Sequence, residues 1–398
     1  MNPAPSAAAT PPAKGALLTI FLTVLIDTIG FGLFVPYIAP FGRSLGASDW
    51  VNGLLVGTFS LFQFLCAQGW GRLSDRIGRR PVLLIGLLGS SFAHLAFGFA
   101  GSLPLLFVAR ALAGGFGATI STAQAYIADV TTPETRTKGM GLIGAAFGLG
   151  FVLGPGLGFF LLELGPRSPA YFASLLSFSA CAFGFFKLKE PARNADPSLR
   201  RVVDRRSLEI VFADKARVRL LFGFVFVVLS FAALESMFTR LGQERLQLTM
   251  REMNGLFAVV GILMVVVQGG LIRRLAPKYG EVTLVRAGSA LLVTGMLTLA
   301  FATPQWLLIG GGMLAGVGYS VMFPALQGRL SKSAPTAIQG ATFGVAQSGS
   351  SLCRFIGHSG AGLAFDVWTG LPFVLAAVIA LGAGTLGSKP RAGEQSQS

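Results

Sequence analysis

The sequence predicts an all-α membrane protein with about twelve transmembrane helices in two six-helix bundles, and three observations lead to this prediction. The 398 residues are 53% hydrophobic and only 12% charged, with a mean hydropathy of +0.67, whereas roughly a quarter of a soluble domain is charged. Apolar runs of about 18 or more residues, each able to cross the bilayer core, recur along the chain. The alternating pattern of a transmembrane β-strand is missing, so we expect helices.

About twelve apolar segments form the expected spans, and a long polar stretch separates the sixth from the seventh. The segment that begins at Leu17 is too long for the core of a signal peptide and contains Asp27, so we interpret it as a retained first span. The predicted spans are residues 17–39, 50–71, 81–100, 104–128, 138–162, 168–188, 217–239, 252–272, 282–302, 304–328, 338–363 and 370–388.

The spans divide the chain into two bundles and three polar regions. We expect a disordered cytoplasmic N-terminus at 1–16, an N-terminal six-helix bundle at 17–188, a cytoplasmic linker at 189–216, a C-terminal six-helix bundle at 217–388 and a cytoplasmic tail at 389–398. The loops after the second span of each half look related. Such weak duplication is typical of transporters whose substrate site lies between the halves near the midplane.

The basic residues predict the topology. A net charge of +15 and a pI near 10.6 would suggest nucleic acid as a partner of a soluble protein. With a cytoplasmic N-terminus, however, about 25 of the 32 Lys and Arg residues fall on the inner side. We therefore expect no nucleic-acid partner, both termini in the cytoplasm, and a multi-pass protein of the plasma (inner) membrane in contact with lipid.

No metal, other cofactor or ATP is expected. Cys66, Cys181 and Cys353 lie singly in apolar segments, and the two histidines form no paired ligand motif. The sequence contains no GxxxxGK[ST] phosphate loop. A receptor or a lipid-modifying enzyme is an alternative class, but an enzyme needs a nucleophile and base or metal ligands at one membrane depth, and we find none.

The loop between the second and third spans carries the strongest single motif, which contains Gly71, Asp75, Arg76, Gly78, Arg79 and Arg80. It matches the GxLaDrxGrkp signature almost completely, and here the chain resembles the major facilitator superfamily. Glycines allow a tight turn, and an acid at a helix end can meet a neighbouring helix terminus or a basic side chain. We interpret the loop as a conformational gate. If the arginines only fixed the topology, the acid would be unexplained.

A carboxylate in the first span is the second signal. Asp27 lies in a stretch similar to the first-helix signature of twelve-span drug/proton antiporters. An ionised Asp at mid-helix costs roughly 2.5 kcal/mol or more unless it faces a cavity or a partner. We therefore predict that Asp27 borders the substrate cavity and couples to protons. The alternative is a structural carboxylate that is bonded to a neighbouring helix.

The fourth span contains a buried cation. Arg110 precedes Gly114 and Gly117 in a pattern that resembles the family's RxxxGxxgA motif. Arginine keeps its proton at accessible pH, so we expect Arg110 to tune a nearby carboxylate and not to carry the proton itself. A static buried ion pair is the alternative. Gln124, further along this span, is expected to line the cavity.

The fifth span is rich in glycine, with Gly150, Gly154, Pro155, Gly156 and Gly158. Small residues at four-residue spacing share a helix face for close packing, and proline removes a backbone hydrogen bond. The segment resembles the antiporter motif gxxxGPxxGG, with Phe159 in place of the last glycine, and the resemblance implies export. The alternative is an ordinary glycine-rich helix contact.

The second half supplies further ionisable groups. Glu235 lies in the seventh span, and Arg354 and His358 lie at i and i+4 on one face of the eleventh. Each is expensive in lipid, so we expect them in the cavity, with Glu235 as a second protonation site. His358, and His94 of the third span, are candidate proton relays. Packed, hydrogen-bonding histidines are the alternative.

The resemblance points to the tetracycline/proton antiporters within the superfamily. Where those antiporters carry a third-span aspartate important for tetracycline, this chain has Ala93 beside His94. The resemblance implies a monomer whose partners are protons and a small-molecule substrate, and we predict proton-coupled efflux of a broader class of small lipophilic or cationic drugs by alternating access. The alternative within transport is a proton symporter or a facilitator for uptake of a small metabolite.

Overall fold

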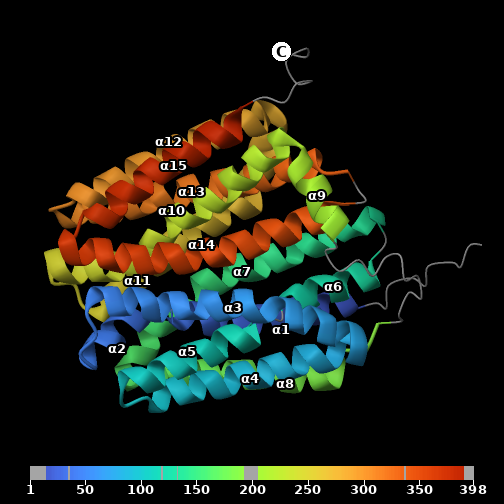
Figure 1. Cartoon of the computed structure of the whole chain (residues 1–398). Helices are drawn as coiled ribbons and strands as arrows, with labels where there is room; N and C mark the ends of the chain where they lie inside the picture. Colours follow the sequence, from blue (N-terminus) through green and yellow to red (C-terminus); the bar gives the residue numbers. More distant parts are fainter. Residues whose placement is uncertain are drawn as a thin grey trace, which may run out of the picture.

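The computed structural model describes residues 15–34, 36–117, 120–131, 133–191, 205–335 and 338–389. In these residues all regular secondary structure is helical, which confirms the predicted fold class. The long helices run roughly side by side along one common direction (Figure 1). The linker prediction at 189–216 falls partly outside the described residues, and its described part contains a short helix, α9 (Arg205–Ala213).

Helices occur at the positions of all the predicted spans. The first half contains α1 (Ala16–Phe34), α2 (Ile38–Ser44), α3 (Asp49–Ile77), α4 (Arg79–Phe99), α5 (Leu103–Gly117), α6 (Ile120–Val130), α7 (Pro133–Leu161), the 3₁₀ turn η1 (Leu162–Leu164) and α8 (Ser168–Lys187). The second half contains α10 (Lys215–Leu246), α11 (Met250–Val266), the π-helical turn η3 (Val267–Leu271), α12 (Ile272–Phe301), α13 (Gln305–Ser333), α14 (Gln339–Val367) and α15 (Leu371–Ser388).

The two halves repeat one packing pattern. In the first half α1 packs against α7 and α8, α5 against α3 and α4, and α4 also against α8. In the second half α10 packs against α14 and α15, α13 against α11 and α12, and α12 also against α15. The turn after the second span of each half also contains a glycine with positive φ, Gly78 at 110° and Gly280 at 74°. The halves meet where α3 lies along α14 and α7 along α11.

Nine helical segments in the described residues are long and apolar enough to cross a membrane. Among the described residues, α11 and α14 do not meet these criteria, and both lie where the halves meet. Their composition explains this. The helix α14 contains Arg354 and His358 among many small and polar residues, and α11 ends after 17 residues at the π-helical turn. Helices that face another half need less apolar surface than helices that face lipid.

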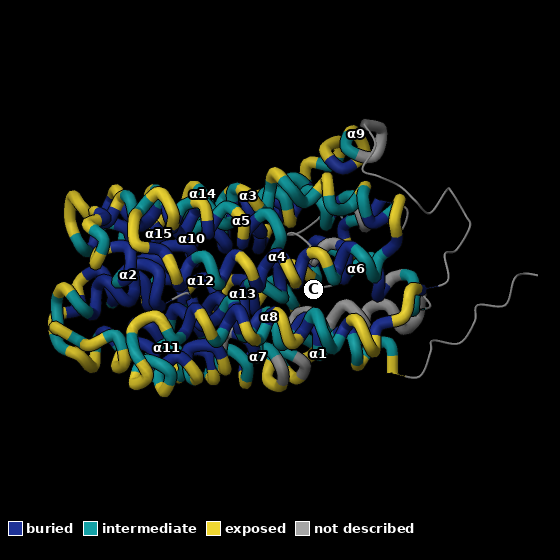
Figure 2. The backbone as a smooth tube through the Cα atoms, turned by 90° about the horizontal axis from the view of Figure 1, so that it is seen from below, coloured by how far each residue is buried: buried dark blue, intermediate teal, exposed yellow. Residues whose placement is uncertain are grey.

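The burial pattern is that of a protein surrounded by hydrocarbon. Buried residues fill the middle of the bundle, and exposed residues follow its outside (Figure 2). Large apolar side chains are nevertheless common on the outside, among them Phe92 at 62%, Phe186 at 80% and Trp306 at 70% exposure. Such a surface would promote aggregation in water, but acyl chains solvate it in a bilayer.

Candidate functional site

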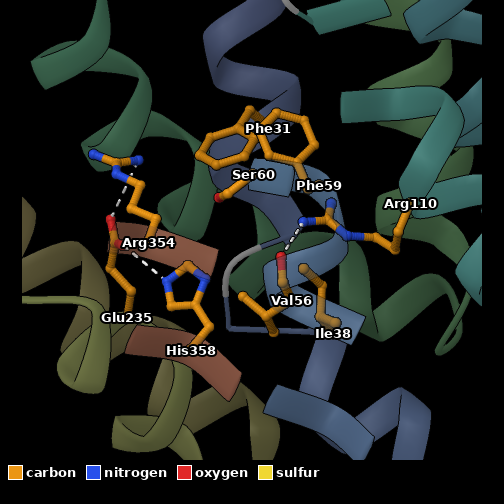
Figure 3. Close-up of a pocket in the computed structure, with 9 residues that line it drawn as sticks. All are labelled: Phe31, Ile38, Val56, Phe59, Ser60, Arg110, Glu235, Arg354 and His358. Atoms are coloured by element: carbon orange, nitrogen blue, oxygen red, sulfur yellow. Dashed lines mark hydrogen bonds and ion pairs between the residues drawn. The ribbon is translucent and has the colours of Figure 1, made fainter. Parts of the chain in front are cut away.

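A small cavity lies in the centre of the bundle, between the halves (Figure 3). Its walls come from α1, α2, α3 and α5 of the first half and from α10 and α14 of the second. The volume open to a water-sized molecule is about 20 Å³, which is room for about one water and far below the roughly 300–1,000 Å³ of drug-sized sites. The lining residues are Phe31, Ile38, Val56, Phe59, Ser60, Arg110, Glu235, Arg354 and His358.

The carboxylate of Glu235 faces two nitrogen-bearing side chains of α14. Its Oε2 lies 3.2 Å from Nε2 of His358, and its Oε1 lies 3.9 Å from Nη1 of Arg354. Glu235 and His358 are only 9% and 5% exposed. The i, i+4 spacing places Arg354 and His358 one turn apart, so both reach the same carboxylate. A buried acid with two exchangeable partners can take up a proton while its neighbours rearrange.

Arg110 reaches the cavity from the opposite side in Figure 3. It is 3% exposed, and its Nε and Nη2 donate to the backbone oxygens of Leu55 and Val56, each at 3.4 Å. Its guanidinium also lies 4.8 Å from the ring centroid of Phe59. Among the described residues, no acidic side chain forms an ion pair with Arg110. Within this part of the chain, Arg110 therefore makes no direct contact through which it could tune the pKa of a carboxylate, as the sequence led us to expect.

Asp27 belongs to a second cluster, inside the first half. The hydroxyl of Ser177 on α8 donates to Oδ1 of Asp27 at 2.9 Å and lies 3.4 Å from Nδ1 of His94 on α4. The His94 ring stacks on Phe34 at a centroid distance of 4.8 Å. Ser177 is fully buried, whereas Asp27 keeps part of its surface exposed. No sequence pattern selects Ser177, because serine is common in packed membrane helices.

The predicted cavity residues thus form two groups, not one. Arg110, Glu235, Arg354 and His358 line the cavity between the halves, and Asp27 and His94 meet through Ser177 within the first half. Gln124 lies half-buried on α6 and belongs to neither group.

The predicted gate loop is a compact ionic turn between α3 and α4. Arg79 lies 2.6 Å from Oδ1 of Asp75, and its Nε donates to Oδ2 of Asp129 on α6 at 3.0 Å. Its Nη1 also donates to Ser74 at 2.6 Å. Gly78 turns the chain with φ 110° and ψ 161°, a region that favours glycine. The other loop residues differ in exposure: Gly71 and Arg80 are half-buried and Arg76 is exposed.

Glu190 binds the start of α4 beneath this turn. Its two carboxylate oxygens accept the backbone N–H groups of Arg79 and Arg80 at 2.7 and 2.9 Å. An anion at a helix N-terminus satisfies free N–H groups and complements the helix dipole. A Cβ at Gly78 would lie 2.7 Å from Oε1 of Glu190, so a larger residue there would also displace this carboxylate. The sequence analysis missed Glu190, which is far from this loop in the chain.

The glycine-rich helix α7 packs tightly on α1, as its spacing predicts. A Cβ at Gly154 would lie 2.6 Å from Cα of Gly32, and one at Gly150 would lie 2.8 Å from the carbonyl carbon of Thr28. Gly158 faces Asn254 of α11, across the boundary between the halves. Gly156 has open space beside it, and Pro155 is buried within α7. The small side chains on this face allow the close approach of the backbones.

Two ion pairs cross between the halves at one end of the bundle. Nε of Arg240 on α10 lies 2.9 Å from Oδ1 of Asp49 at the start of α3, and both side chains are nearly buried. Arg251 of α11 pairs with Glu163 of η1 at 2.6 Å on the surface. We call this region, which also includes the carboxylate of Asp366 on the backbone N–H of Trp50 at 2.9 Å, the closed end. The sequence analysis did not select these residues.

A helical bundle in two similar halves, with buried ionisable groups at their junction, defines a secondary membrane transporter. The family model described as Major Facilitator Superfamily matches residues 20–358. The chain therefore belongs to the Major Facilitator Superfamily, and it is a multi-pass membrane protein.

Proteins similar to this chain include drug-resistance proteins. It is 32% identical to the tetracycline resistance protein, class B, of Escherichia coli, over 84% of each chain. It is 31% identical to multidrug resistance protein 1 of Bacillus subtilis (strain 168), over 92% of this chain and 94% of that one. Among solved structures, the human organic anion transporter MFSD10 (TETRAN) matches 95% of this chain and all of its own, with a TM-score of 0.74 and 25% identity.

Proposed function

We propose that this protein exports small lipophilic compounds from the cytoplasm in exchange for protons, by alternating access. The observation that carries the proposal is the position of Glu235, His358 and Arg354, which face a cavity formed by both halves. The similarity to tetracycline and multidrug resistance proteins supports a drug-like substrate. A rocking motion that moves α3 and α7 relative to α14 and α11 changes the surroundings of these groups, which is how conformation and protonation become coupled.

The proposal assigns a role to Glu235, to its two partners on α14 and to the cluster around Asp27. Glu235 exchanges the proton, and His358, whose Nδ1 has no partner among the described residues, passes it on. Arg354 holds Glu235 while the carboxylate is charged and releases it on protonation. Asp27, with Ser177 and His94, forms a second protonation site in the first half.

The closed end fits a conformation in which access is blocked on one side. The pairs Asp49 with Arg240 and Glu163 with Arg251 hold the halves together there. We propose that this end faces the outside, that both termini are cytoplasmic, and that the protein acts as a monomer in the plasma membrane, in agreement with the distribution of basic residues.

Reconstituted liposomes with an imposed pH gradient test this function. The cation ethidium and the anion naphthalene-2-sulfonate are loaded separately into liposomes that contain the wild-type protein or the Glu235→Gln variant, and their movement is followed by fluorescence. The wild type should move at least one of the two compounds against the proton flux, and the variant should lose the dependence on the pH gradient while its membrane insertion is unchanged. Movement of substrates only in the direction of the proton flux would contradict export and favour the symporter.

A further inference from the structure

The charges that face the central cavity do not balance. Its described lining contains two arginines, Arg110 and Arg354, and one acid, Glu235. Arginine stays protonated under all accessible conditions, so the lining has a net positive charge even when Glu235 is ionised and His358 is neutral. A cationic compound would therefore enter a region of unfavourable potential.

Arg110 is the origin of this imbalance. Arg110 is only 3% exposed, and within the part of the chain that the structure describes its hydrogen bonds reach only to backbone oxygens of α3, at 3.4 Å. Those oxygens lie within a helix whose own N–H groups already compete for them. Buried cations are normally paired with an acid, because removing an unpaired charge from water is expensive. Arg354 differs, because it already has Glu235 at 3.9 Å and Tyr319 beside it.

Aromatic rings lie next to the guanidinium of Arg110. Phe59 lies beneath Arg110, with 4.8 Å between the guanidinium carbon and the ring centroid, and the rings of Phe31 and Phe59 are 5.0 Å apart. In Figure 3 these rings and Ser60 lie between Arg110 and the Glu235 group. A flat apolar body can stack here, and an acidic group on it can reach Arg110.

From these contacts we infer that the transported compound is an aromatic or lipophilic anion, and that Arg110 binds its acidic group. This inference rests on the proposed transport function and replaces the cationic substrate by an anionic one. The acidic group supplies the counter-ion that no described residue places on Arg110, and the rings of Phe31 and Phe59 bind the apolar body.

Two probes that share one body and carry opposite permanent charges test the inference. Naphthalene-2-sulfonate is the anion, and trimethyl(2-naphthyl)ammonium is the cation; neither changes charge between pH 5 and 9. Binding to the purified protein in detergent is measured by titration calorimetry for the wild type, Arg110→Gln and Arg110→Lys. Arg286→Gln removes a charge from an exposed position on α12 and is the matched control.

The wild type should bind the sulfonate about tenfold or more tightly than the ammonium. Arg110→Gln should remove most of this preference by weakening the sulfonate alone, Arg110→Lys should retain part of it, and Arg286→Gln should leave it unchanged. If Arg110→Gln does not fold, the preference of the wild-type protein decides. Equal or tighter binding of the ammonium, or no saturable binding of the sulfonate, would overturn the inference. Export of ethidium in the liposome assay together with such a result would leave the proposed function intact and reject only the anion.

Discussion

Nε of Arg240 and Oδ1 of Asp49, 2.9 Å apart, form a nearly buried ion pair that joins α10 of one half to the start of α3 of the other. Asp49 also accepts from Arg43, whose side chain is 42% exposed, at 3.2 Å. One acid therefore has a buried partner across the boundary and an exposed partner in its own half. This difference allows the contribution of the contact between the halves to be separated from that of a surface pair.

Arg240→Gln should open the closed end, because it leaves Asp49 without its buried partner. Loss of one member of a buried pair costs about 3–5 kcal/mol, whereas a surface pair such as Arg43 with Asp49 contributes about 0–1 kcal/mol. The measurement is the rate at which a thiol reagent labels Phe365→Cys beside this contact. The rate should rise in Arg240→Gln and stay near the wild-type value in Arg43→Gln. Equal rates in both variants would show that the pair does not hold the end closed.

Glu235→Gln and Asp27→Asn should each abolish proton-driven exchange, although the two acids lie in separate clusters. Glu235 contacts His358 in the cavity between the halves, and Asp27 contacts Ser177 within its own half. We expect Glu235→Gln to abolish the response to a pH gradient. Asp27→Asn should abolish proton-driven exchange while sparing membrane insertion. Full activity of Asp27→Asn would remove it from the mechanism, and full activity of Glu235→Gln would remove the proposed primary site.

Gly154→Ala should destabilise the protein, because its Cβ would lie 2.6 Å from Cα of Gly32 and 2.7 Å from the backbone nitrogen of Leu33. Backbone atoms cannot move aside without separating α1 from α7, so a loss of roughly 1–3 kcal/mol is expected. Gly156→Ala, two residues away, meets nothing within 4 Å and should be neutral or stabilising by up to about 1 kcal/mol, because alanine favours helices. Thermal unfolding in detergent measures both. Equal melting temperatures would contradict the close contact.

Arg79→Gln should weaken the turn between α3 and α4, because it removes the bridge between Asp75 and Asp129. A double-mutant cycle with Asp129→Asn should give a coupling free energy of about 0.5–3 kcal/mol, since the two side chains are in direct contact. Arg72→Gln, at an exposed position of the same segment, is the control. Additive effects of Arg79→Gln and Asp129→Asn would show that the bridge contributes nothing to stability.

Glu190→Gln should loosen the start of α4, because a neutral amide no longer complements the helix dipole and presents only one acceptor oxygen to the N–H groups of Arg79 and Arg80. The expected cost is about 1 kcal/mol. Hydrogen exchange of the Arg79 and Arg80 amides measures it directly. Unchanged protection of these amides would show that the carboxylate does not cap the helix.

The sequence predicts the helices well, because the requirement to cross hydrocarbon leaves long apolar segments that can be counted. It also predicts that Glu235, Arg354 and His358 belong together, since ionisable groups in membrane helices need a common polar place. The glycine spacing of α7 predicts close packing without naming α1 as the partner. In each of these cases a local pattern carries the information.

Contacts between segments that lie far apart in the chain could not be predicted from the sequence. Ser177 bridges Asp27 and His94 from a helix about 150 residues away from Asp27, and Glu190 caps a helix more than a hundred residues before it. The closed end depends on which charged residues of the loops face one another, and no periodicity encodes this. The sequence marks Arg110 as an ionisable group in a membrane helix, and the structure places it at 3% exposure, but its neighbours on α3 depend on how α5 packs against that helix.

The central cavity has space for about one water molecule. A compound of drug size must therefore separate the two halves and the rings of Phe31 and Phe59 before it fits. The free-energy cost of this opening weakens the observed binding. A cavity that adapts its shape to the bound compound discriminates only weakly between compounds by their shape. In the proposed function, selection therefore rests on charge and on apolar surface, and chemically unrelated compounds that share these two properties should be transported by the same protein.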